Sequence, residues 1–223
     1  MRLSRTLAAL ALVASTAVSA HGQTTFVGSG AAFGTPDGFI QWGGLGPSST
    51  AVSNPFTINT TITGLTATAS QASNPFERRD QGIGWAGNFA NGANLLWAGG
   101  TNGPMSFLFN NQISAFGTQI QNDYFGAFIA SISAYDASNN LLGSYTVNGF
   151  SNSNADDSAV FIGISSTVGI SRIDLGMTSG VQDFAINDVR LDNVVTATPE
   201  PASLLLLASG LGVIGVIRRR KTT

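Results

Sequence analysis

Few side chains in this sequence could carry out chemistry, and their types exclude most classes of enzyme. The chain has a single histidine, His21, and no cysteine. A cysteine nucleophile, a thiolate metal site, a disulfide framework and a lipid-modified cysteine are therefore excluded. A serine–histidine–aspartate triad needs a histidine held within the fold, whereas His21 lies at the expected start of the mature chain. A copper site built on an amino-terminal histidine would need a second histidine, so we expect no catalytic or metal-binding role for His21.

Carboxylates could support glycosidic hydrolysis without a histidine, but the sequence offers no convincing acid and base. Glu77 is the one glutamate between the two hydrophobic ends of the chain, and the adjacent Arg78 and Arg79 would hold its pKa low rather than raise it for acid catalysis. Asp156 and Asp157 are neighbours, so on a strand their side chains would point to opposite faces. We predict no catalytic residue and expect a protein that is not an enzyme, with a polysaccharide hydrolase as the last-ranked alternative.

A calcium site is the metal site that the sequence comes nearest to supporting. Asp183, Asp188, Asp192 and Asn193 are close in sequence, and Ca²⁺ prefers carboxylate and amide oxygens. Asp188 and Asp192 would share a strand face if the strand ran unbroken. However, the spacing matches no calcium-binding loop of the form D-x-[DN]-x-[DN]-G followed by a glutamate. We therefore predict no metal site and no cofactor, and leave a structural calcium ion open.

Tryptophans suggest a possible carbohydrate site, because sugars bind by stacking their apolar faces on aromatic rings. Trp42, Trp85 and Trp97 all lie beside glycines, whose open loops would let the rings face solvent. Large aromatic side chains are more often part of the core, and the leucines before Trp97 favour its burial. Trp42 and Trp85 are thus the candidate carbohydrate-stacking residues.

The part of the chain between the hydrophobic ends, residues 21–198, is acidic and long enough for one domain. It carries four arginines and eleven acidic residues, a net charge of −7. Such a body repels phosphate backbones, so nucleic acid is excluded as a partner. Its length is ample for one domain with a hydrophobic core and too short for two comfortable ones.

The pattern of apolar residues in this body predicts β-structure throughout. Residues 105–117 alternate apolar and polar side chains, as a half-buried strand does. Residues 133–147 indicate a hairpin, after whose turn Leu141, Tyr145 and Val147 would share one face. Three further strand-like runs follow at 159–165, 169–177 and 183–195. We predict an all-β domain, an antiparallel β-sandwich or jelly roll, with a single barrel as the alternative.

The first 20 residues have the three-part layout of a secretory signal peptide. Arg2 and Arg5 precede an apolar region at residues 7–18, and small residues follow it. Cleavage is expected after Ala20, with Ser19 as the second choice. We therefore expect an exported body, with signal peptidase and the secretion machinery as partners.

The other end of the chain predicts one C-terminal transmembrane helix. Residues 202–217 contain no charge and would span roughly 24 Å as a helix, somewhat less than the ~30 Å hydrocarbon core of a bilayer. A small mismatch of this kind is tolerated. The cations Arg218, Arg219, Arg220 and Lys221 follow directly and favour a cytoplasmic C-terminus, as stop-transfer residues do.

The tail resembles the sorting tail of the PEP-CTERM proteins of Gram-negative bacteria. The resemblance rests on Pro199, Glu200 and Pro201, the apolar helix after them and the terminal arginines, in that order. Thr198 departs mildly from the valine often found before the motif. A glycolipid-anchor signal normally lacks the terminal cations, and a sortase signal needs Leu-Pro-x-Thr-Gly. The resemblance implies that an exosortase, a membrane protease and transpeptidase, recognises the Pro-Glu-Pro segment and removes the helix.

Together these features predict three segments and one main function. The segments are a signal peptide at 1–20, an extracellular β-sandwich domain at 21–198 and a sorting tail at 199–223. The body is also similar to β-sandwich domains found before such tails, notably in residues 184–194. We expect a non-enzymatic protein held transiently in the inner membrane and then placed at the cell surface or in the extracellular matrix. A carbohydrate-binding module for exopolysaccharide is the alternative.

Overall fold

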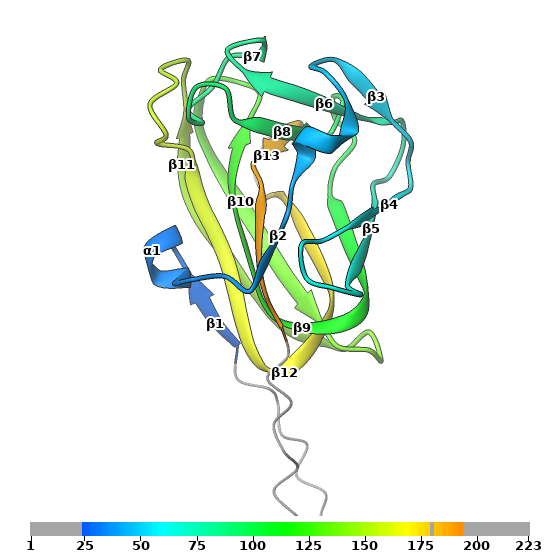
Figure 1. Ribbon diagram of the computed structural model, residues 1–223. Helices are drawn as coiled ribbons and strands as arrows, with labels where there is room; N and C mark the ends of the chain where they lie inside the picture. Colours follow the sequence, from blue (N-terminus) through cyan, green and yellow to red (C-terminus); the bar gives the residue numbers. More distant parts are fainter. Residues whose placement is uncertain (1–23, 179–180, 194–223) are drawn as a thin grey trace, which may run out of the picture.

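The computed structural model describes residues 24–178 and 181–193. Within them lie fourteen strands, one short helix and one 3-10 turn (Figure 1). The helical elements are α1 (Gly30–Phe33) and η1 (Trp42–Leu45). The strands are β1 (Thr24–Val27), β2 (Gly38–Ile40), β3 (Thr50–Val52), β4 (Phe56–Asn59), β5 (Thr66–Ser70), β6 (Phe76–Gln81), β7 (Gly84–Trp85), β8 (Asn94–Trp97), β9 (Met105–Asn122), β10 (Gly126–Tyr135), β11 (Leu141–Ser151), β12 (Val160–Met177), β13 (Phe184–Ile186) and β14 (Val189–Asn193). The prediction of an all-β, antiparallel fold is confirmed; only β6 and β7 pair in parallel.

Two long strands, β9 and β12, join the layers of the sandwich. They pair along most of their length, but the register shifts between Ser165 and Ile170, where both strands bend near the lower end of the molecule in Figure 1. Beyond the bend β9 folds back over itself: the rings of Phe107 and Phe116, on the same strand, have centroids 5.7 Å apart. A sheet bent at such irregularities can cover its own apolar face.

Each layer uses one half of the two long strands. The first layer has the order β11, β10, the C-terminal half of β12, the N-terminal half of β9, β5 and β4. In the second layer β1 pairs with the N-terminal half of β12, and the C-terminal half of β9 pairs with both β13 and β14. There β14 continues to β2, whereas β13 continues to β8, β6 and β3.

The core follows the predicted alternation in some strands. Met105, Phe107 and Phe109 are buried, while Leu108 between them is 55% exposed. The predicted hairpin is also present, as β10, a turn and β11. One detail was wrong: Leu141 is exposed, because the register shifts between Ala134 and Tyr135 and takes Leu141 off the inner face.

The last predicted strand is broken in the middle. Asn187 and Asp188 separate β13 from β14, so the condition under which Asp188 and Asp192 would share a face is not met. At the break the Asn187 carbonyl accepts a hydrogen bond from the Trp42 indole N–H at 3.0 Å. The interruption therefore anchors η1 to the sheet and leaves polar side chains near the surface.

Both ends of the described body lie at the same end of the sandwich. Thr24 pairs with Ser166, and Asn193 pairs with Ile113, on either side of the bend in β9 and β12. Figure 1 shows β1 beginning and β14 ending toward that lower end. The expected signal peptide, cleavage site, sorting motif and transmembrane helix lie outside the described residues. Across residues 24–178 and 181–193, no helix has the length and hydrophobicity needed to cross a membrane.

Candidate functional site

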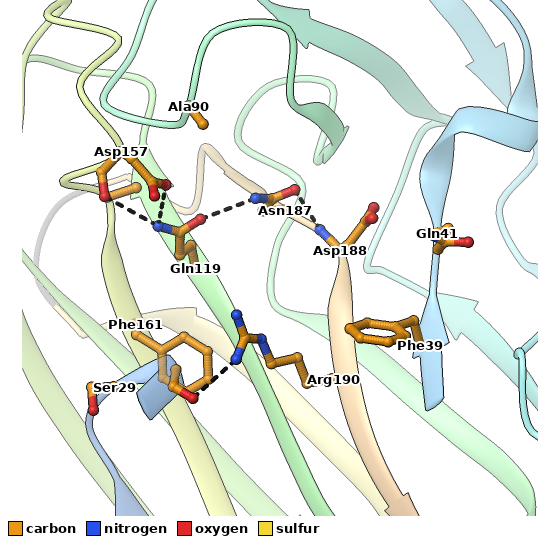
Figure 2. A pocket seen from close by; sticks show the side chains of 12 residues that line it. Ser29, Phe39, Gln41, Ala90, Gln119, Asp157, Phe161, Asn187, Asp188 and Arg190 are labelled. Atoms are coloured by element: carbon orange, nitrogen blue, oxygen red, sulfur yellow. Dashed lines mark hydrogen bonds between the residues drawn. The ribbon is translucent and has the colours of Figure 1, made fainter. Parts of the chain in front are cut away.

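A cavity of about 570 Å³ lies on the outer face of the second layer (Figure 2). It is lined by Ser29, Gly30, Phe39, Gln41, Ala90, Gln119, Asp157, Ala159, Phe161, Asn187, Asp188 and Arg190. The floor comes from β2, β14, β9 and β12, and the walls come from the start of α1 and from the loops that carry Ala90 and Asp157. The lining mixes two phenyl rings with amides, carboxylates and one guanidinium.

Strand register places these side chains side by side. Arg190 pairs with Phe39 on β2 and with Gly117 on β9, and Gly117 pairs in turn with Gly163 on β12. A Cβ at Gly117 would come within 2.6 Å of the Phe161 ring and within 2.9 Å of the Phe33 ring. The missing side chain at Gly117 therefore lets both rings lie close against the sheet beside Arg190.

A chain of hydrogen bonds fixes the amides of the cavity. Gln119 donates through Nε2 to Asp157 Oδ1 at 2.9 Å, and its Oε1 accepts from Asn187 Nδ2 at 3.0 Å. The Asn187 Oδ1 atom accepts from the Asp188 backbone N–H at 2.7 Å. Figure 2 shows this row crossing the cavity from the Asp157 loop to Asp188. Fixed amides present donors and acceptors to a ligand in defined directions, at little entropic cost.

Arg190 is the cation of the cavity. Its Nη1 donates to the Gly30 carbonyl at 2.9 Å, and its guanidinium lies 5.7 Å from the centre of the Phe161 ring. A Cβ at Gly30 would meet the guanidinium at about 2.9 to 3.1 Å, so the absence of a side chain there makes the contact possible. Among the described residues Arg190 forms no ion pair. Its remaining N–H groups can serve a ligand.

Asp188 lies directly before β14, two residues from Arg190 along the chain. Burial raises the pKa of its carboxyl, while hydrogen bonds from the Trp42 backbone N–H and from the Gln41 side chain act to lower it. A carboxylate, an arginine and two amides around phenyl rings suit a ligand with many hydroxyl groups, because such side chains both donate and accept hydrogen bonds.

The two predicted carbohydrate-stacking tryptophans are not at this cavity surface. Trp42 is fully buried in the main core, and Trp85 is 5% exposed and packs against Phe89 and Trp97. A buried ring cannot stack on a sugar, so this prediction was wrong for both residues; the apolar burial of a large ring outweighed the flexibility of the neighbouring glycines. The aromatic rings of the cavity are Phe39 and Phe161 instead.

The aspartates considered for calcium do not come together. Asp183 accepts from the Trp97 indole N–H at 2.6 Å, and Asp188 faces Trp42 and Gln41. Asp192 accepts from the backbone N–H of Asp37, and Asn193 donates its own backbone N–H to Asp37. Within the part of the chain that the structure describes, no three acidic or histidine side chains group as a metal site would require.

The remaining carboxylates considered for catalysis lie apart from one another. Glu77, on β6, forms an ion pair with Arg79 at 2.9 Å. Asp156 is bound by Ser158, whose hydrogen bond lowers the pKa of the carboxyl. Of the pair Asp156 and Asp157, only Asp157 lines the cavity. Sequence spacing pointed to neither Gln119 nor Asn187, since polar residues on strands are common. Phe161 stands within four consecutive apolar residues, 159–162, so the sequence did not show which way its ring points.

The predicted residues of the two ends have no described geometry. Ala20, the sorting residues Pro199, Glu200 and Pro201, and the cations Arg218, Arg219, Arg220 and Lys221 all lie outside the described residues.

Comparison with known proteins bears mainly on the tail. Residues 197–221 match the PEP-CTERM protein-sorting motif. No curated protein matches the chain. A DUF4465 family protein from Bacteroides caccae is 13% identical, with a TM-score of 0.38, over 75% of this chain and 100% of that one. CsCBM6-3 from Clostridium stercorarium, solved in complex with cellobiose, is 13% identical, with a TM-score of 0.32, over 56% of this chain and 86% of that one.

Proposed function

Because residues 197–221 match the PEP-CTERM protein-sorting motif, we propose that an exosortase reads this tail and delivers the body to the cell surface or extracellular matrix. In this proposal signal peptidase cleaves after Ala20, residues 202–217 hold the chain in the inner membrane during transit, and cleavage near Pro199, Glu200 and Pro201 ends that attachment. The body then acts outside the cell without catalysing a reaction.

The arrangement of the body supports this proposal. The last described strand ends at Asn193, and five residues separate it from Pro199. Five residues span at most about 18 Å when fully extended, so the folded body is held close to the membrane while the motif is read. Thr24 and Asn193 lie at the same end of the sandwich, whereas the cavity opens on the outer face of the second layer.

Replacing Glu200 tests the sorting proposal. We expect Glu200→Ala to leave the full-length chain in the membrane fraction, because the recognition segment loses its charge while the apolar run stays intact. Thr222→Ala, which lies just beyond the matched segment, is the control and should be processed as the wild type is. Cell fractionation with intact-mass analysis measures both. Processing of Glu200→Ala at the wild-type level would contradict the proposal.

A second candidate function, carbohydrate binding, is favoured by the cavity. Phe39 and Phe161 provide apolar faces, and Gln41, Asn187 and Arg190 provide hydrogen-bonding groups next to them. Both aspartates of the cavity already accept hydrogen bonds from the protein, which offsets part of their charge. We propose that this cavity, rather than the buried tryptophans, binds polysaccharide at the cell surface.

Two cavity variants test carbohydrate binding. Arg190→Lys keeps the charge but loses the planar fork of donors, so we expect affinity to fall about tenfold or more; Gln41→Ala should cost a few-fold. Gln112→Ala removes an exposed glutamine from the bend of β9, far from the cavity, and should bind as the wild type does. The measurement is affinity electrophoresis of the full-length chain, in detergent, through gels containing hydroxyethyl cellulose, galactomannan or alginate.

The outcome separates the candidate functions. Unretarded migration in all three polysaccharides, or equal retardation of the wild type and Arg190→Lys, would overturn binding in the cavity and leave the sorting proposal untouched. Release of reducing ends from any of the polysaccharides would instead support the hydrolase alternative.

A further inference from the structure

A second concave surface lies beside the cavity, at the end of the sandwich away from the chain termini. This cleft has a volume of about 410 Å³ and is lined by Asn88, Asn148, Gly149, Phe150, Asn152, Ser158 and Val160. Val160, in the cleft, pairs with Ile120 of β9. Asn193, the last described residue, pairs with Ile113, which is seven residues earlier on the same strand. At about 3.3 Å per residue the cleft is therefore more than 20 Å from the attachment end.

One stretch of chain separates the cleft from the cavity. Along residues 157–161 the odd-numbered members line the cavity, whereas Ser158 and Val160 line the cleft. The loop before β8 also serves both sites, since Ala90 lines the cavity and Asn88 lines the cleft. Because successive side chains of an extended chain point to opposite sides, the two sites open in different directions and are held rigidly relative to each other.

Phe150 gives the cleft an exposed aromatic face. Its side chain is 64% exposed on β11, and its partner across the sheet is Ala127, whose methyl group is too small to cover the ring. Tyr124 and Phe125, in the turn just before β10, are 59% and 60% exposed at the same end. Large aromatic side chains left in solvent in a group are typical of a binding surface.

The polar part of the cleft is fixed by a buried network. Asn88 is 1% exposed; its Nδ2 donates to Ser158 Oγ at 2.9 Å, and its Oδ1 accepts from the Asn152 backbone N–H at 2.7 Å. Gln121, also buried, donates to the same Oδ1 atom at 2.9 Å. This network holds the 152–158 loop in place, so the rim of the cleft is formed before a ligand arrives.

Among the residues that the structure describes, no charged side chain lines the cleft, and this favours an uncharged ligand. Asn148 and Asn152 line the cleft with Phe150. The Asn152 Oδ1 atom accepts from the Asn154 backbone N–H at 2.8 Å, which fixes the amide and leaves its Nδ2 group as a donor for a ligand. A phosphate or carboxylate ligand would lose its hydration and gain no counter-charge here. A neutral sugar fits better, because it has an apolar ring face for the phenyl group and hydroxyl groups for the amides.

We propose that this cleft is a second binding site for neutral polysaccharide, with Phe150 stacked on a sugar ring and Asn148 and Asn152 bound to its hydroxyl groups. The site is independent of the cavity. Its consequence depends on the carbohydrate binding proposed above: with both sites occupied, one body holds two polysaccharide segments and cross-links them without forming a dimer. Two rigidly linked sites also raise the overall avidity for a long chain.

Substitutions at Phe150 test the cleft. We expect Phe150→Ala to weaken binding about 2- to 10-fold. Phe150→Trp keeps a stacking face and should bind as the wild type does. Phe150 is exposed, so its loss should not affect folding. Leu141→Ala is the matched control, since it removes another exposed apolar side chain from the far end of β11. The full-length chain in detergent is examined by affinity electrophoresis in galactomannan and by light scattering of galactomannan mixtures.

The outcomes distinguish the two sites. Cross-linking seen with the wild type should be lost in Phe150→Ala and in Arg190→Lys, while each single variant still binds. If Phe150→Ala binds more weakly while Arg190→Lys binds as the wild type does, polysaccharide binding in the cleft is supported and binding in the cavity is rejected. Wild-type binding and cross-linking by Phe150→Ala overturn the cleft. The cleft is equally overturned if Phe150→Ala instead loses sedimentation with vesicles of phosphatidylethanolamine and phosphatidylglycerol, which would make Phe150 a membrane contact.

Discussion

Asp183 shows how a single buried carboxylate is accommodated in this body. The residue is 5% exposed directly before β13, and the Trp97 indole N–H donates to its Oδ1 at 2.6 Å. Burial raises the pKa of the Asp183 carboxyl, and the hydrogen bond from Trp97 only partly offsets this effect. Its charge also adds to the raised pKa of nearby Asp123, for which burial is the larger cause. The charged form of Asp183 thus costs folding free energy at neutral pH.

We expect Asp183→Asn to stabilise the protein at neutral pH. A carboxyl whose pKa is raised by folding contributes stability that is present below its unfolded pKa and is lost as the pH rises through its folded pKa. The amide keeps an acceptor for Trp97 but carries no charge. The free energy of unfolding of the variant should therefore exceed that of the wild type at pH 7, and the excess should shrink toward pH 4. Urea denaturation from pH 4 to pH 8 measures this difference.

Asp156→Asn is the control for this pH series. Its carboxyl is exposed, and the hydrogen bond from Ser158 lowers its pKa, so its contribution to stability is present at neutral pH and is lost in acid. The two variants should therefore deviate from the wild type in opposite directions at pH 7. An Asp183→Asn curve that runs parallel to the wild type at every pH would show that burial of the charge has no net cost.

At the scale of elements, the outer face of the second layer depends on facing glycines. Gly117 on β9 pairs with Gly163 on β12, and the rings of Phe33 and Phe161 lie over Gly117. Phe33 is the buried residue of α1, so the short helix is held on the sheet at this notch. The same notch positions Phe161 at the cavity. The missing side chain at Gly117 therefore both lets α1 pack closely on the sheet and shapes the cavity.

Gly117→Ala should destabilise the protein. The new Cβ would lie 2.6 Å from the Phe161 ring, so the ring must move, and overpacking of this kind costs about 1 to 3 kcal/mol. For a domain of this size the melting temperature should fall by about 2 to 12 °C. Gly44→Ala is the control, because nothing lies within 4 Å of its added Cβ. Thermal unfolding followed by circular dichroism measures both, and equal melting temperatures would refute the packing argument.

Strands could be predicted from the sequence where apolar and polar side chains alternate with a period of two residues. The alternation of Met105, Phe107 and Phe109 led to the correct inner face of β9. The runs at 159–165 and 169–177 were predicted separately, whereas both belong to β12. Residues 166–168 lie between the two runs, and there the strand continues through the bend, with Ser166 paired to Thr24 of β1. Long-range pairing of this kind leaves little signal in local sequence.

At the scale of the whole molecule, charge and topology both favour a role outside the cell. The acidic body repels nucleic acid, and Thr24 and Asn193 place both ends of the described chain at one end of the sandwich. The cavity and the cleft share residues 157–161 as a common wall. Under the proposed function, one polysaccharide chain or two would bind at neighbouring surfaces of the same body.

The sequence by itself determined the fold class and the sorting signal, for different physical reasons. Burial on one face of a strand imposes a period of two, so all-β structure is visible locally. The sorting motif is a short linear segment, Pro199 to Pro201 with an apolar run and cations after it, and needs no folded context to be read. Only the tertiary structure decided which aromatic side chains are exposed. Trp42 and Trp85 are buried and Phe150 is exposed, because exposure depends on which strands pack over a side chain, and those strands come from distant parts of the chain.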